Sequence, residues 1–130
     1  MIWHFRHQKN QAGSMLISLM IFVVVSLAIV IAAVLLVIDS TITASNQQIG
    51  AATLTIAESG IENAMLRLLR DPSYTGETLT VGDGKTVITV TGNAPLTIRS
   101  VGTLGSFERT VVVTSARVNG VLTVTSWNEI

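Results

Sequence analysis

The sequence predicts an α+β protein in which one long N-terminal helix, first transmembrane and then amphipathic, packs on a small antiparallel β-sheet. Three observations support this prediction. Residues 15–38 carry no charged side chain, and the helical pattern then continues without proline to Arg70. From Glu77 onward, Thr, Val and Ile recur with a period of two between Gly and Asn residues. The expected outline is that of a lollipop, with a helical stalk and a small β head.

The composition indicates that part of the chain lies outside water. Hydrophobic residues make up 48% of the 130 residues and charged residues only 12%, whereas charged residues are about a quarter of a typical soluble domain. The residues outside the apolar stretch are enough to form one small domain. The absence of cysteine excludes disulfides and thiol chemistry, so packing alone must stabilise that domain.

The apolar stretch Met15–Ile38 is long enough to span a bilayer. At 1.5 Å per residue it forms about 36 Å of helix. It is longer than the apolar core of a secretory signal peptide and has no polar break before Asp39, which disfavours cleavage after it. Arg6 and Lys9 precede the stretch, so the positive-inside tendency predicts a cytoplasmic N-terminus.

Beyond the apolar stretch, the helix is expected to end near Arg70, where Asp71 and Pro72 stop it. Two apolar stripes follow helical spacing, and we expect them on different faces. The first comprises Ile42, Ile49 and Ile56; the second comprises Leu54, Ala57, Ile61, Ala64, Met65 and Leu68. One stripe suffices to cover a small sheet. The isoleucine stripe is therefore either a contact surface for neighbouring helices or ordinary half-exposed surface.

Period-two segments predict five strands connected as an antiparallel meander. The predicted strands are Glu77–Val81, Lys85–Thr91, Leu96–Val101, Phe107–Val118 and Val121–Trp127. Gly82-Asp83-Gly84 predicts one tight turn, and Asn119-Gly120 is a strong signal for a type I′ hairpin turn. The distal half of the helix is the element available to cover the apolar face of this sheet.

Few residues suggest catalysis, metal binding or nucleic-acid binding. Both histidines, His4 and His7, lie near the N-terminus, ahead of the apolar stretch, so we expect neither an enzyme nor a metal or cofactor site. Glu58 and Glu62 lie one helical turn apart, which is more typical of a solvated flank than of a carboxylate site. The basic residues are scattered without aromatic neighbours, so no direct nucleic-acid partner is expected.

The most informative pattern is the junction at Gly13. Residues 1–13 are polar and basic, and the apolar helix follows the glycine at once. This arrangement resembles the class III signal of type IV prepilins. The stretch 57–64, AESGIENA, resembles a helical stretch of PilX-like minor pilins. The resemblance implies that a prepilin peptidase cuts between Gly13 and Ser14 and that Ser14 becomes the methylated N-terminus. Glycine suits this site because it lets the leader pass close to the protease and breaks the helix there.

This chain departs from the pattern of major pilins at two positions. Major pilins begin the mature chain with an aromatic residue or Met and carry glutamate as its fifth residue, whereas this chain has Ser14 and Ser18. The resemblance implies that this glutamate pairs with the N-terminal amine of a neighbouring subunit in major pilins, because an isolated buried charge is unfavourable. The departure favours a minor pilin or pseudopilin. Its assembly helix would contact neighbours through Ser18, Ala28, Ala32 and Ala33.

The resulting expectation is a leader at 1–13, a transmembrane half-helix at 14–38, an exposed amphipathic half-helix at 39–71 and a β head at 72–130. The expected partners are prepilin peptidase, other pilin subunits and an inner-membrane assembly platform. The subunit would cross the inner membrane once, with its head outside, and then join a cell-surface filament. The alternative is an uncleaved, signal-anchored protein whose β head is an extracytoplasmic binding module.

Overall fold

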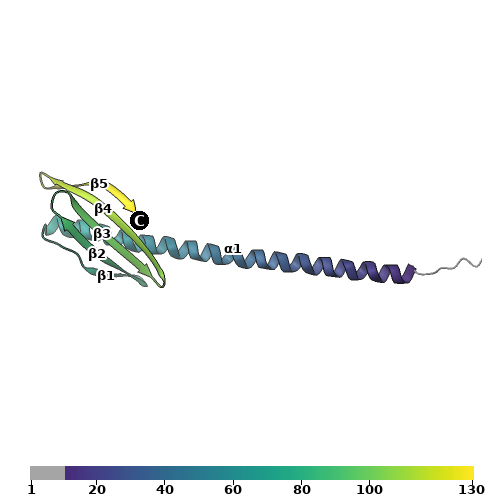
Figure 1. Ribbon diagram of the computed structural model, residues 1–130. Coiled ribbons are helices and arrows are strands. Elements are labelled where there is room, and N and C mark those ends of the chain that lie inside the picture. Colours follow the sequence, from purple (N-terminus) through teal and green to yellow (C-terminus); the bar gives the residue numbers. More distant parts are fainter. Residues whose placement is uncertain (1–10) are drawn as a thin grey trace, which may run out of the picture. The chain divides into compact units, whose positions relative to one another are not determined.

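The computed structural model describes residues 11–130, so most of the predicted leader, including His4 and His7, lies outside the described residues. The chain is α+β, as predicted: helix α1 (Gln11–Arg70) is followed by five strands (Figure 1). It divides into two compact units, the first ending at Thr43 and the second running from Ala44 to Ile130. We call the second unit the β domain.

Helix α1 ends at Arg70, as predicted, but its start differs from the prediction. The expectation that Gly13 breaks the helix is wrong, because α1 begins at Gln11 and runs through Gly13. A single glycine lowers helix stability by only about 1 kcal/mol, and the apolar residues that follow it continue the helix.

The five strands form one antiparallel sheet in chain order, β1-β2-β3-β4-β5. Their bounds are β1 Thr78–Val81, β2 Gly84–Gly92, β3 Leu96–Leu104, β4 Phe107–Val118 and β5 Val121–Glu129. All five predicted strands are confirmed. The main difference is β3, which extends to Leu104 because Gly105, with φ of 59°, forms a tight turn with Ser106. Positive φ at Asn119 (53°) and Gly120 (80°) confirms the type I′ turn.

A β-bulge changes the side-chain alternation of β5. Ser115 pairs with Val124 and Thr114 pairs with Ser126, which leaves Thr125 as the extra residue. Its Oγ1 donates to the Thr114 carbonyl oxygen at 3.0 Å. One extra residue reverses the phase of alternation, so Val124 and Trp127 lie on the same face of the sheet.

The core of the β domain lies between the distal part of α1 and one face of the sheet. Of the two predicted stripes, the second faces the sheet. Its buried members are Ala57, Ile61, Ala64 and Leu68, and they form one cluster with Ile88, Ile98, Val111 and Val113. Leu54 and Met65 pack against this cluster from its edges.

The prediction that the isoleucine stripe occupies a different face is wrong. Ile56 is only 7% exposed, Ile49 is half-buried and Ile42 is exposed. The sheet-facing arc of the helix is wide enough to include Ile56, whose side chain occupies the space beside Gly84 on β2. Ile56 and Ile49 therefore belong to the edge of the core of the β domain, whereas Ile42, in the first unit, remains exposed.

Close approach between α1 and the sheet depends on glycines. A Cβ on Gly60 would overlap the Ser100 hydroxyl and lie 2.8 Å from the Thr86 hydroxyl, and these two buried hydroxyls share a 2.7 Å hydrogen bond. On the sheet side, a Cβ on Gly102 would lie 2.7 Å from the Ala57 amide nitrogen. Small residues at the contact allow helix and sheet to pack over a thin layer of buried hydroxyls.

The C-terminal end of α1 is tied to the start of the sheet by Glu77. One carboxylate oxygen of Glu77 accepts hydrogen bonds from the Asn63 amide at 2.8 Å and the Tyr74 hydroxyl at 3.1 Å. The same oxygen lies 3.2 Å from Arg67 Nε. Partial burial, reinforced by the hydrogen bond to Glu77, raises the pKa of Tyr74 to about 12. We call these four residues the Glu77 cluster.

The raised pKa of Tyr74 predicts a loss of stability at high pH. Because the folded-state pKa exceeds the ordinary value of 10.0, the contribution of the protonated hydroxyl is fully present below the unfolded-state pKa and is lost as pH rises through about 12. Urea unfolding across this window should show a steeper loss for the natural chain than for Tyr74→Phe, which keeps the ring but does not titrate. Equal slopes in the two chains would contradict the prediction.

Candidate functional site

The first candidate site is the apolar surface of α1 in the first unit. The helix contains a stretch long and apolar enough to cross a membrane, and none of that stretch is buried within the chain. Apolar side chains are exposed all around it, from Val25 at 51% to Met15 at 77%. A helix that is apolar on every side requires lipid or other helices around it. It is therefore a candidate transmembrane helix.

The predicted assembly residues lie on this surface. Ala28 and Ala32 are four residues apart and share one helix face, whereas Ala33 lies on the adjacent face. Ala33 also lines a shallow apolar depression with Val30, Val34, Val37 and Ile38. Small residues one turn apart permit close approach of a second helix in an apolar medium. Ser18 is exposed, but its hydroxyl is not free, because it donates a hydrogen bond to the Ser14 carbonyl oxygen at 2.9 Å.

The predicted cleavage junction is exposed. A Cβ on Gly13 would meet no atom within 4 Å, and Ser14 is exposed. Both residues lie in the first turns of α1, where the earliest amide groups have no carbonyl partner within the helix. Such turns fray. Unwinding the helix around Gly13 therefore costs less free energy than unwinding a turn in the helix interior.

Comparisons with family models, with curated proteins and with solved structures find no match to this chain. Its function is therefore inferred from its own residues and their geometry.

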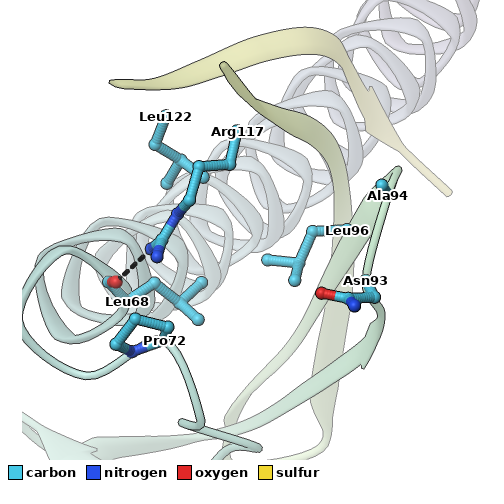
Figure 2. A pocket seen from close by; sticks show the side chains of 7 residues that line it. All are labelled: Leu68, Pro72, Asn93, Ala94, Leu96, Arg117 and Leu122. Carbon is cyan, nitrogen blue, oxygen red and sulfur yellow. Dashed lines mark hydrogen bonds between the residues drawn. The ribbon is translucent and has the colours of Figure 1, made fainter. Parts of the chain in front are cut away.

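A second candidate site is a pocket of the β domain where α1 ends (Figure 2). It is lined by Leu68, Pro72, Asn93, Ala94, Leu96, Arg117 and Leu122. The guanidinium of Arg117 reaches across the pocket and donates to the Leu68 carbonyl oxygen. That carbonyl belongs to the last helical turn, where acceptors lack partners and a cation complements the helix dipole. Sequence reasoning missed this role, because Arg117 is 49 residues from its acceptor along the chain.

The contact of Arg117 predicts a modest effect on stability. Arg117→Met keeps the aliphatic stem but removes the guanidinium, and it should destabilise the β domain by about 1 kcal/mol, since the residue is largely exposed. Arg99→Met, on the opposite face of the sheet, is the matched control and should leave stability unchanged. Urea unfolding of the full chain in detergent measures both. Equal effects would show that the Leu68 contact contributes nothing.

Within residues 11–130, no group of three or more His, Cys, Asp or Glu side chains is placed to hold a metal. Glu58 is half-buried and Glu62 is exposed. Both lie on the flank of α1 away from the core. The only carboxylate that several side chains surround in the described β domain is Glu77, whose partners tie the end of α1 to the sheet. Its arrangement stabilises the fold rather than presenting a reactive group.

Proposed function

We propose that this chain is a minor pilin or pseudopilin, a structural subunit of a type IV pilus or of a type II secretion-like filament. The observation that carries the proposal is the junction at Gly13. There a short basic leader meets a membrane-length apolar helix that continues to Arg70, and the distal part of this helix covers a five-stranded sheet. In this proposal, prepilin peptidase cuts between Gly13 and Ser14, and Ser14 becomes the methylated N-terminus.

Before assembly, the subunit crosses the inner membrane once, with its N-terminus in the cytoplasm and its β domain outside. Arg6 and Lys9 ahead of the apolar stretch support this orientation. An assembly platform then transfers the helix from lipid into a bundle with the helices of other pilin subunits. Because lipid and neighbouring helices are equally apolar, packing decides the balance of this exchange. Ala28 and Ala32 on one exposed face favour close packing in the bundle.

The position of Ser18 supports a minor rather than a major subunit. By resemblance, major pilins use a glutamate here to pair with the N-terminal amine of a neighbour. Ser18 instead bonds within its own helix, to the Ser14 carbonyl oxygen, and offers no counter-charge for such an amine. A subunit placed at a filament end, or present in few copies, does not need that pairing on both sides.

The alternative is an uncleaved, signal-anchored protein whose β domain is an extracytoplasmic binding module. One observation favours it: α1 already includes Gln11 and Gly13, and proteases bind their substrates as extended chain. Cleavage at Gly13 therefore requires the first turn of the helix to unwind. In the alternative, that turn stays folded and the chain keeps its leader.

Mass spectrometry of the mature N-terminus after co-expression with a prepilin peptidase tests the proposal. The natural chain should begin at a methylated Ser14, and Gly13→Val should remain largely uncut, because a β-branched side chain blocks close approach of the protease. Ser14→Ala is the matched control at the other side of the bond and should still be cut. An intact leader in the natural chain beside an active peptidase would overturn the proposal and favour the alternative.

A further inference from the structure

The sheet of the β domain ends in two free edges. Strands β1 and β5 occupy the two ends of the strand order, so in the described part of the chain the outward amide and carbonyl groups of each have no neighbouring strand. The first edge extends beyond β1, since the carbonyl oxygens of Thr75 and Glu77 accept hydrogen bonds from the amides of Val90 and Ile88, both at 2.8 Å. Free edges of this length bind further strands unless something prevents it.

Charged side chains are the usual protection of a free edge, and both edges carry few of them. The one charged residue of β5 is Glu129 at its end, and it is ion-paired with Arg109 of β4 at 3.0 Å. Residues 118–128, which contain nearly all of β5, include no charged residue and no proline. Residues 78–81 of β1 carry no charge either. The nearest acid to β1 is Glu77, whose carboxylate is held toward the helix by Asn63 and Arg67. Repulsion between like charges therefore does not oppose contact between the β1 edge and the β5 edge.

Apolar side chains continue along both edges on the helix-facing side. On β5, Leu122, Val124 and Trp127 share this side as a result of the bulge at Thr125. Val124 and Trp127 remain 41% and 43% exposed, because the core cluster is built on β2, β3 and β4. On β1, half-buried Leu79 and Val81 lie on the same side. A strand added to either edge with its apolar side chains on this side would cover these residues.

We propose that β5 of one copy of this chain pairs in parallel with β1 of a second copy. The inference rests on the proposed function, because copies assembled from one membrane share their orientation. In a five-stranded antiparallel meander, β1 and β5 run in the same direction. Two copies of like orientation therefore bring β5 beside the β1 of the next copy, as parallel strands in one continued sheet. Such head-to-tail pairing leaves a free edge at each end of the pair and needs only two copies, which agrees with a subunit present in few copies.

Disulfide cross-linking tests this pairing, since the chain has no cysteine of its own. Thr80 on β1 and Thr123 on β5 are exposed residues of the opposite, non-helical face. Neighbouring strands bring Cα atoms within the range a disulfide bridges. Full-length Thr80→Cys and Thr123→Cys chains, with tags of different size, are co-expressed in membranes with the peptidase and oxidised. A second pair with Asn128→Cys in place of Thr123→Cys allows for another register.

The expected result is a mixed dimer of the two differently tagged chains in at least one pair, with its loss when Thr125→Lys adds a charge to the β5 edge. Thr89→Lys, on central strand β2, is the matched control and should keep the dimer. Failure of both mixed pairs, or a dimer formed by Thr123→Cys alone, would overturn the inference. The N-terminus is sequenced in the same samples. Processed chains without the mixed dimer would contradict the edge pairing alone, whereas unprocessed chains would contradict the proposed function.

Discussion

Replacing Gly60 with alanine is expected to destabilise the β domain by about 2 kcal/mol, the usual effect of overpacking a tight core. The added Cβ would overlap the Ser100 hydroxyl and lie 2.8 Å from Oγ1 and 2.9 Å from Cγ2 of Thr86. Either the buried Thr86–Ser100 hydrogen bond breaks or the helix moves away from the sheet. Both outcomes outweigh the gain of about 1 kcal/mol that alanine brings to a helix.

Gly50→Ala provides the matched control on the same helix. Gly50 is also buried, but its Cβ would meet only one terminal nitrogen of Arg109 at 3.4 Å, at the end of a flexible side chain. At this position the higher helix propensity of alanine should dominate, and the free energy of unfolding should rise by up to about 1 kcal/mol. Urea unfolding of the full chain in detergent, followed by circular dichroism, measures both variants. If Gly60→Ala is as stable as Gly50→Ala, the close contact between α1 and the sheet is wrong.

Much of this fold could be predicted from local sequence, because its decisive signals act over a few residues. Pro72 stops the helix, Asn119-Gly120 selects one turn type, and alternating β-branched residues mark the strands. The β-bulge at Thr125 was not predicted, because it becomes apparent only when β5 is aligned with β4. The same holds for the short Gly105-Ser106 turn, whose strand extension depends on pairing with the neighbouring strand.

The candidate sites divide in the same way. The apolar helix surface could be predicted, since the length and uniform apolarity of residues 15–38 can be read directly from the residue types. The contact of Arg117 with the Leu68 carbonyl could not, because it joins residues far apart in sequence. Ile56 was assigned to the wrong face for a related reason. Helical spacing gives its angle around α1, but the width of the covered arc depends on how closely Gly60 and Gly102 let the sheet approach.

A charge in the middle of the apolar stretch should strongly weaken membrane insertion of the chain. Leu27→Asp is expected to disfavour membrane insertion by about 3 kcal/mol, or about a hundredfold in the equilibrium, because an aspartate at the centre of a bilayer loses its hydration. Carbonate extraction of membranes from cells expressing the full chain should then release much more of the variant than of the natural protein. The amount of α1 folded in detergent should change little, since Leu27 contacts no core.

Leu66→Asp is the matched control for this substitution. Leu27 and Leu66 lie on the same helix and are equally exposed, at 58% and 59%. In both variants an exposed leucine on a helix is replaced by aspartate, so their local effects on helix stability should be alike. Leu66, however, lies in the β domain, where the charge stays in water and membrane attachment should be unaffected. Release of both variants to a similar extent would show that general destabilisation, not membrane insertion, explains the effect. If Leu27→Asp stayed in the membrane fraction as fully as the natural chain, the apolar stretch would not be the anchor. The proposed transfer of this helix from the membrane into a filament would then be contradicted.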